Sequence, residues 1–335
     1  MNKDQARNNE AREGLDRRGF LKSAAAGAIA GATLPMMAGS RARANAAVST
    51  PLLDTLPTDL PELPKITLGT GADGQPVQIT RVICGSNPVE GYSHSTQAMT
   101  DHMMEWFTPE RRVEYLHAIE RCGIDTWQCS AAEDSMESVA EARRQGSNIK
   151  WMPLAGPGRG QPSIEEIKSL DPIAIIHHGG RTDAAFRTGR AQEVRDYVKA
   201  IKDAGLLAGV SAHNPDVIKQ IADEGWENDF FLCCMYNVTN QQRVVDALGT
   251  RTVGHPWLVN DPDVMGDVIR QVDKPCMAFK ILAAGRLVGR GNQVETAWRE
   301  SFERIKPTDG IIIGIYKYHT EIPASVRYCD QFGRV

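Results

Sequence analysis

The chain has 335 residues, of which 41% are hydrophobic and 24% charged, and its formal net charge is −4. A charge balance this close to neutral argues against nucleic acid as a partner. After the N-terminal region no segment is long and apolar enough to span a bilayer, which needs about 20 apolar residues, so we expect no stable membrane insertion.

The N-terminal segment has the pattern of an export signal. Residues 16–22 read Asp-Arg-Arg-Gly-Phe-Leu-Lys, which resembles a twin-arginine signal, and a weakly apolar run rich in alanine and glycine follows. Ala44 and Ala46 offer small residues at a cleavage spacing. We therefore expect residues 1–46 to be a signal peptide, the twin-arginine translocase to be a partner during export, and the mature protein to be periplasmic. The alternative is a flexible basic tail.

Residues 47–64 separate this signal from the folded part of the chain. Four prolines lie between Val48 and Pro64, which predicts an extended, proline-rich linker. Residues 65–335 then form one domain, and their length suits an α/β barrel. This domain starts with two alternating runs between Lys65 and Ile79 that flank an Asp-Gly turn, a pattern typical of a β-hairpin.

After the hairpin, eight short apolar runs alternate with amphipathic segments. The runs are continuous rather than alternating, as in parallel strands buried on both faces. Eight strand and helix units predict a closed (β/α)8 TIM barrel with an N-terminal β-hairpin. The expected strands are Arg81–Gly85, Gly123–Cys129, Ile149–Leu154, Pro172–Ile176, Leu206–Val210, Phe230–Tyr236, Cys276–Leu282 and Gly310–Gly314.

The order of several short motifs resembles the aldo/keto reductase superfamily. Ile175 to His177 resembles the family's strand that ends in a catalytic histidine. The segment from Gly209 to Asn214 is similar to its Gly-Val-Ser-Asn turn, and Ala283 to Leu287 to its Gly-x-Leu turn. The resemblance implies a hairpin that closes the barrel bottom, and NADP as the cofactor. It places the nicotinamide near the Gly-Val-Ser turn.

The chain departs from that family at the catalytic positions. The family's aspartate falls on Gln128 and its tyrosine on Glu133, and no lysine ends the third strand. Only the histidine is retained, as His177 or His178. The resemblance therefore supports the barrel more than the reductase reaction, which needs a proton donor tuned near the working pH.

Polar residues gather where the predicted strands end, which is the face that carries the active site in such barrels. Histidine suits both proton transfer and metal binding near neutral pH. His177 and His178 are adjacent and point opposite ways in strand geometry, so at most one faces the lumen. The expected catalytic residues are His177, His178, His213, Lys280 and Asp183.

Lys280 is expected inside the apolar strand Cys276–Leu282 and should point into the barrel. Its alternative roles are an ion pair with a neighbouring carboxylate, or an amine of lowered pKa that acts as a base or forms a Schiff base.

Two kinds of cofactor remain open on the sequence alone. Two histidines and a carboxylate can ligate a divalent metal, and the metal candidates are His94, His177 and His213. For NADP or another anion, the candidates are Ser211, Asn214, Arg286 and Lys317, because they follow strands or lie in a basic glycine-rich loop.

Seven cysteines show no CxxC spacing and fall mainly in strand-like runs, so we expect buried thiols.

Three functions remain open. The first is an exported enzyme of the isomerase or lyase type that acts on a small sugar or hydroxy/carbonyl compound by histidine-based or metal-assisted chemistry. The second is an NADP-dependent oxidoreductase, and the third is a non-catalytic periplasmic binding barrel.

Overall fold

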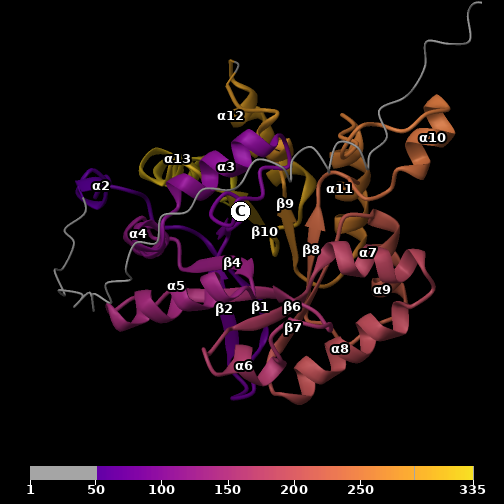
Figure 1. Ribbon diagram of the computed structural model, residues 1–335, viewed down its shortest axis with the longest axis horizontal. Coiled ribbons are helices and arrows are strands. Elements are labelled where there is room, and N and C mark those ends of the chain that lie inside the picture. Colours follow the sequence, from indigo (N-terminus) through magenta and orange to yellow (C-terminus); the bar gives the residue numbers. More distant parts are fainter. Residues whose placement is uncertain (1–50, 290, 335) are drawn as a thin grey trace, which may run out of the picture. The chain divides into compact units, whose positions relative to one another are not determined.

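The computed structural model describes residues 51–289 and 291–334. The predicted signal peptide and the start of the linker lie outside these residues. Eight parallel strands close into a barrel in the order β10-β3-β4-β5-β6-β7-β8-β9, preceded by the antiparallel hairpin of β1 (Lys65–Thr70) and β2 (Pro76–Thr80). Figure 1 shows the strands at the centre and the helices around them. The predicted (β/α)8 barrel with an N-terminal hairpin is confirmed.

The barrel strands are short, and each is almost entirely buried. They are β3 (Val82–Gly85), β4 (Thr126–Ser130), β5 (Lys150–Ala155), β6 (Ala174–His177), β7 (Leu207–Ala212), β8 (Phe230–Cys234), β9 (Cys276–Phe279) and β10 (Gly310–Gly314). Their burial on both faces is the physical reason for the continuous apolar runs in the sequence.

The helices follow the strands as in a βα repeat. They are α2 (Pro51–Asp54), α3 (Gln97–Trp106), α4 (Pro109–Arg121), α5 (Glu133–Arg144), α6 (Ile164–Lys168), α7 (Gly179–Arg187), α8 (Ala191–Asp203), α9 (Pro215–Asp223), α10 (Gln242–Leu248), α11 (Asp261–Gln271), η1 (Ala283–Gly285), α12 (Gln293–Arg304) and α13 (Tyr318–Phe332).

Two of these helices are not among the elements that the sequence pattern predicts. Helix α3 buries none of its residues, so it leaves no apolar periodicity; the Thr96 hydroxyl caps it by accepting from Met99 N. Helix α7 begins with Gly179 and Gly180, which are poor helix formers. Both helices matter for the site, because residues beside them or on them face the barrel mouth.

The hairpin closes the amino end of the barrel. Ile66, Leu68 and Ile79 of β1 and β2 are at most 5% exposed and pack in one cluster with side chains from inside the barrel. This agrees with the position that the family resemblance implied. The inner barrel residues of the cluster are Ile83, Met152, Ala174, Ile176, Leu207, Phe230, Leu232, Met277 and Ile312. A second, larger cluster lies between the strands and the outer helices.

The described part of the predicted linker is packed rather than free. Leu56 and Leu63 are 4% and 5% exposed within the outer core, and Asp54 forms an ion pair with Arg121 of α4. Leucines alternate with the prolines here, and burying them stabilises an otherwise extended segment. The linker is not extended throughout, because Pro51–Asp54 form the short helix α2, and the buried leucines decide where the rest of it lies.

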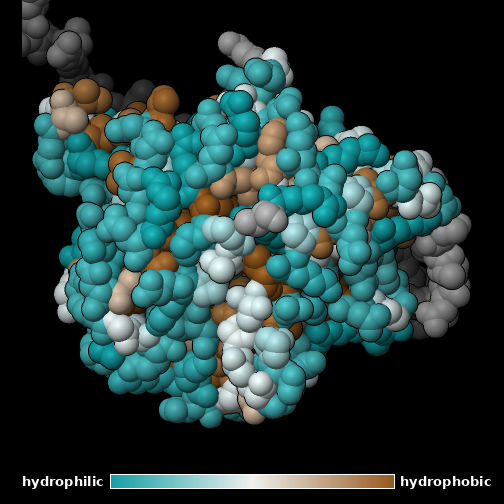
Figure 2. All heavy atoms as spheres, turned by 180° about the vertical axis from the view of Figure 1, so that it is seen from behind, coloured by the Kyte–Doolittle hydropathy of each residue, from teal (hydrophilic) through white to brown (hydrophobic). Residues whose placement is uncertain are grey.

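The predicted state of the cysteines is confirmed, since all seven are buried free thiols. Within the described ranges, no helix has the length and apolar character needed to cross a membrane. Figure 2 shows a mostly hydrophilic face with more apolar atoms near its middle. Exposed apolar side chains also occur along the segment around α10, at Leu248, Val253 and Val259.

Candidate active site

A cavity of about 1940 Å³ opens at the carboxyl ends of the barrel strands. Four histidines line it, together with one lysine that follows β9. This is the face on which enzymes of this fold carry their chemistry, and the cavity is large enough for a small organic substrate. The five residues are His94, His178, His213, His255 and Lys280.

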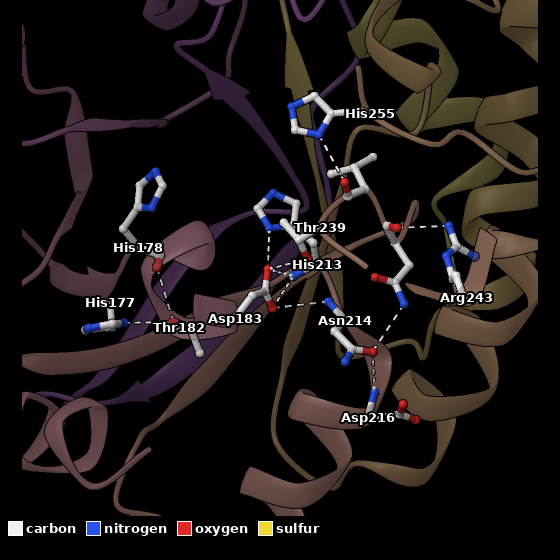
Figure 3. A network of polar contacts seen from close by, with 12 residues as sticks. His177, His178, Thr182, Asp183, His213, Asn214, Asp216, Thr239, Arg243 and His255 are labelled. Atoms are coloured by element: carbon white, nitrogen blue, oxygen red, sulfur yellow. Dashed lines mark hydrogen bonds and ion pairs between the residues drawn. The ribbon is translucent and has the colours of Figure 1, made fainter. Parts of the chain in front are cut away.

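The strongest polar arrangement in the wall joins β7 to α7. The Nδ1 atom of His213, directly after β7, lies 2.8 Å from Oδ2 of Asp183 on α7 (Figure 3). The Asp183 side chain is only 4% exposed, and that of His213 is 12% exposed. Gly179 allows this approach, because a Cβ there would lie 2.8 Å from Ser211 Oγ and 3.2 Å from His213 Cε1.

Asp183 is held as a hydrogen-bond acceptor on all sides. Besides the His213 ring, it accepts from the backbone N–H groups of His213 and Asn214 and from the Thr239 hydroxyl at 3.0 Å. A carboxylate that accepts from three other donors has no proton of its own to give. The proton between Asp183 and His213 therefore lies on His213 Nδ1, and the Nε2 atom keeps its lone pair.

The surroundings keep this imidazole neutral. Burial lowers the pKa of His213, the hydrogen bond to Asp183 opposes that effect, and the charge of Lys280 lowers the pKa further. A neutral imidazole with an oriented Nε2 lone pair is the form that accepts a proton in general-base catalysis.

The two adjacent histidines at the end of β6 point in different directions, as expected from the alternation of side chains along a strand. His177 points away from the cavity: its Nδ1 lies 2.7 Å from the Thr182 hydroxyl, and its ring packs edge-on against Tyr197 of α8. His178 lines the cavity. Thr182 and Asp183 are neighbours on α7, so one turn of helix positions both His177 and His213 (Figure 3).

His94 and His255 come from two loops of the mouth. Their ring centroids are 5.7 Å apart. His94 Nε2 lies 3.1 Å from the amide nitrogen of Asn87, and His255 donates through Nδ1 to the Val238 carbonyl at 3.0 Å. Burial lowers the pKa of His94 to about 3, with smaller contributions from Lys280 and neighbouring histidines. This ring is therefore neutral at physiological pH.

Lys280 lies directly after β9, not inside a longer strand as expected. Its φ of 61° belongs to the left-handed region, which breaks the strand at Phe279. Its Nζ atom lies 5.0 Å from the centroid of the Phe279 ring, and the His213 ring meets the same Phe279 ring edge-on at 5.6 Å. Lys280 and His213 therefore lie in the same part of the cavity.

Backbone strain gathers at this mouth. Five described residues other than glycine have a positive φ, and three of them, His94, Lys280 and Ala284, line the cavity. Such conformations cost about 1 to 3 kcal/mol each and persist where surrounding contacts enforce them, often at functional sites. The strain supports a functional role for this wall.

The predicted metal set is not brought together. His177 lies behind the strand, on the far side from His94 and His213. In the part of the chain that the structure describes, no group of three His, Cys, Asp or Glu side chains is placed to hold a metal ion. These three residues therefore do not fit a metal centre, because the side chain of His177 points toward α8.

The predicted cofactor set is also divided. Ser211 and Arg286 line the cavity, whereas Asn214 and Lys317 do not. The Asn214 side chain accepts from Asn237 and from Asp216 N at the start of α9, and Lys317 is exposed at the start of α13. The four residues thus do not form one dinucleotide site, because two of them serve or flank helix starts outside the cavity.

Several residues of the site were not predicted as site residues from the sequence. His255 and Thr239 come from the long segment between β8 and α11, which has no strand end to mark them. Phe279 reads as an ordinary strand residue. The pairing of Asp183 with His213 had one usable signal: each residue follows a neighbouring strand closely, and strand ends meet at the barrel mouth.

Comparisons with known proteins found distantly similar solved structures and no family. The sequence matches no protein-family model and no curated protein. Among solved structures, a glycerol dehydrogenase from Gluconobacter oxydans is 12% identical with a TM-score of 0.42, over 76% of this chain and 93% of that one. An aldo/keto reductase from Brucella melitensis is 11% identical with a TM-score of 0.44, over 82% and 94%.

A third similar structure is the N-acetylmannosamine-6-phosphate 2-epimerase from Clostridium perfringens. It is 12% identical with a TM-score of 0.42, over 75% of this chain and 91% of that one. Structural neighbours thus include aldo/keto reductases and other TIM barrels with different reactions. The fold places the chain among the (β/α)8 barrels.

Proposed function

We propose that this protein is an acid–base enzyme of the isomerase or lyase type, acting on a small hydroxy-carbonyl compound such as a sugar. One observation carries the proposal: a buried carboxylate, Asp183, holds the His213 ring with its free Nε2 available to the cavity. A neutral, oriented imidazole in a partly desolvated cavity is suited to remove a proton from carbon next to a carbonyl group.

The roles of the residues follow from their contacts. His213 Nε2 accepts the proton from the substrate, and Asp183 stabilises the imidazolium that results, because its oxygen already accepts from Nδ1 at 2.8 Å. Electron density released from the C–H bond is stabilised from the side of the cavity that holds Lys280. Return of the proton to the former carbonyl carbon, with the neighbouring hydroxyl proton passing to the former carbonyl oxygen, completes an isomerisation. Loss of a leaving group from the carbon on the other side of the deprotonated carbon completes an elimination.

The test is exchange of substrate hydrogen with solvent deuterium. Small aldoses, ketoses and hydroxy ketones are incubated with the protein in deuterium oxide, and incorporation beside the carbonyl is followed by NMR. The wild type should catalyse exchange with at least one compound. His213→Gln should reduce the rate by roughly 10²- to 10⁴-fold, the usual contribution of a general base.

A matched control lies on the outside of the barrel. His117 of α4 bonds to Gln145 and does not line the cavity. His117→Gln should therefore exchange at the wild-type rate. Equal exchange rates in the wild type and His213→Gln would contradict the proposal.

We also propose that the protein is exported through the twin-arginine pathway to the periplasm. The twin arginines at 17 and 18 support this, and seven free thiols suit a protein that folds before export. Replacing both arginines by lysine should retain the protein in the cytoplasm. Unchanged fractionation of that double variant would argue against this route.

A further inference from the structure

We infer that Lys280 is a nucleophile that forms an imine with the carbonyl carbon of the substrate. This inference rests on the proposed function and adds a covalent step to the same site. It assigns the substrate class as an aldehyde or ketone with a hydrogen on the adjacent carbon.

Lys280 differs from the other lysines that are not exposed. Lys150, Lys202 and Lys306 each pair with an aspartate, and Lys274 donates to the Trp226 carbonyl. Among the described lysines below the exposed class, Lys280 alone has no hydrogen bond or ion pair to an oxygen. Its Nζ atom lies over the face of Phe279, and the Cys234 thiol is an electrostatic neighbour.

A charged amine without an oxygen partner is costly to bury, so such a position calls for another explanation. Burial lowers the pKa of Lys280, and the nearby Cys234 gives little compensation because its own pKa is raised to about 12 and the thiol is neutral. A larger fraction of the amine is therefore unprotonated at neutral pH, and the unprotonated amine is the nucleophilic form.

The backbone keeps this amine in the mouth of the barrel. Lys280 stands in the left-handed region with a φ of 61°, and Ala283 and Ala284 follow with φ values of 48° and 50°. An extended continuation of β9 would carry the chain past the mouth. The strained turn stops the strand and leaves the side chain of Lys280 on the cavity wall.

A base for the next step is close by. His213 and Lys280 both contact the Phe279 ring. The charge of Lys280 also lowers the pKa of His94, His178 and His213, so its Nζ lies within electrostatic range of all three. An imine on Lys280 would thus present its adjacent carbon to the side of the cavity that holds the His213 base.

The covalent step is balanced without a redox partner. The Nζ lone pair forms a bond to the carbonyl carbon while the π electrons move to oxygen, which is protonated. The nitrogen then forms the C=N bond as the oxygen leaves as water. The net change is amine, carbonyl compound and one proton giving protonated imine and water. The cationic imine next draws electrons from the C–H bond that His213 attacks, and hydrolysis reverses the attachment.

The test traps this imine in the full chain. Dihydroxyacetone, hydroxyacetone and glyceraldehyde are each added with sodium borohydride, which reduces C=N to a stable amine, and peptides are mapped by mass spectrometry. The expected result is one dominant adduct, on the peptide that contains Lys280, with at least one probe. No adduct in the wild type, or adducts spread over the exposed lysines, would overturn the inference.

Two variants sharpen the assignment. Lys280→Met keeps a similar volume and removes an unpaired charge, so it should fold and lose the adduct. Lys317→Arg removes an exposed lysine outside the cavity and should keep the adduct. An adduct that persists in Lys280→Met would overturn the inference.

The failure of the imine and the failure of the proposed function give different results. Deuterium exchange that depends on His213, without a trapped adduct in the wild type, would overturn the imine alone. A Lys280 adduct in a wild type that catalyses no exchange would overturn the role of His213 and leave the imine in place.

Discussion

Among the individual residues, Asp183 acts as a positioning residue, because it orients the imidazole of His213. Replacing it by Asn should reduce exchange by about 10²- to 10⁴-fold, because an amide can donate to Nδ1 and so move the imidazole proton to Nε2. The pH profile supplies a second readout. Activity should fall as pH falls through the His213 pKa, and this limb should shift to lower pH in Asp183→Asn, since the hydrogen bond that His213 donates to Asp183 raises that pKa.

Thr239→Val is the matched control for this prediction, because it removes one of the donors to Asp183 and leaves the contact with His213. We expect a much smaller loss of rate and an acid limb near its original position. Equal losses in the two variants, with no shift of the limb in Asp183→Asn, would indicate a structural role only.

The sequence predicted individual residues better than their arrangement. His213, Asp183, His178 and Lys280 could be selected because polar residues after apolar strands meet at one face. Neighbouring strand ends place Asp183 and His213 at the same face, but the hydrogen bond between them depends on α7, whose glycine start conceals the helix. His177 was selected for the same reason as His178, and only the side chain directions in the structure separate them.

At the scale of the element, the turn after β9 contains strain that can be measured. Ala284 has φ and ψ of 50° and 49°, a left-handed conformation that glycine adopts without the steric penalty of a Cβ. Ala284→Gly should therefore raise the free energy of unfolding by up to about 1 kcal/mol, measured by urea denaturation.

The comparison is Ala200→Gly, at an exposed position inside α8 with ordinary helical geometry. That change should lower the free energy of unfolding by about 1 kcal/mol, the usual cost of glycine in a helix. Equal destabilisation in both variants would mean that the turn is not strained.

The strands and helices could be predicted where their burial leaves a pattern of apolar residues in the sequence. All eight barrel strands and the hairpin follow from apolar runs and an Asp-Gly turn. Helix α3 could not be predicted, because none of its residues is buried and its start depends on one hydroxyl, that of Thr96. The predicted end of β9, at Leu282, lies three residues beyond the observed end at Phe279. The apolar residues continue through Leu282, but the backbone turns at Lys280.

At the scale of the whole molecule, buried neutral histidines make stability depend on pH. Burial lowers the pKa of His177 and of His178 to about 4 each, and that of His94 to about 3, from an ordinary value of 6.5. At a pH between each lowered pKa and 6.5, the histidine is protonated in the unfolded chain and neutral in the folded chain. Stability is therefore present above pH 6.5 and is lost as pH falls toward 4.

Urea denaturation at pH 7 and pH 5 measures this effect before most carboxylates titrate. Each such histidine contributes up to about 1.4 kcal/mol per pH unit to the slope. His177→Gln should give a shallower slope than the wild type, whereas His117→Gln on the outer surface of the barrel should not. An unfolding free energy that stays constant from pH 7 to pH 5 would show that these rings are not held neutral by the fold.

The most direct test of the central claim is the protonation state of His213, read by nitrogen-15 NMR of the imidazole at pH 7 without substrate. We predict a neutral ring with its proton on Nδ1 and a free lone pair on Nε2, because the Asp183 carboxylate accepts from Nδ1 at 2.8 Å. A ring that is charged at pH 7, or that carries its proton on Nε2, would contradict the assignment of His213 as the base.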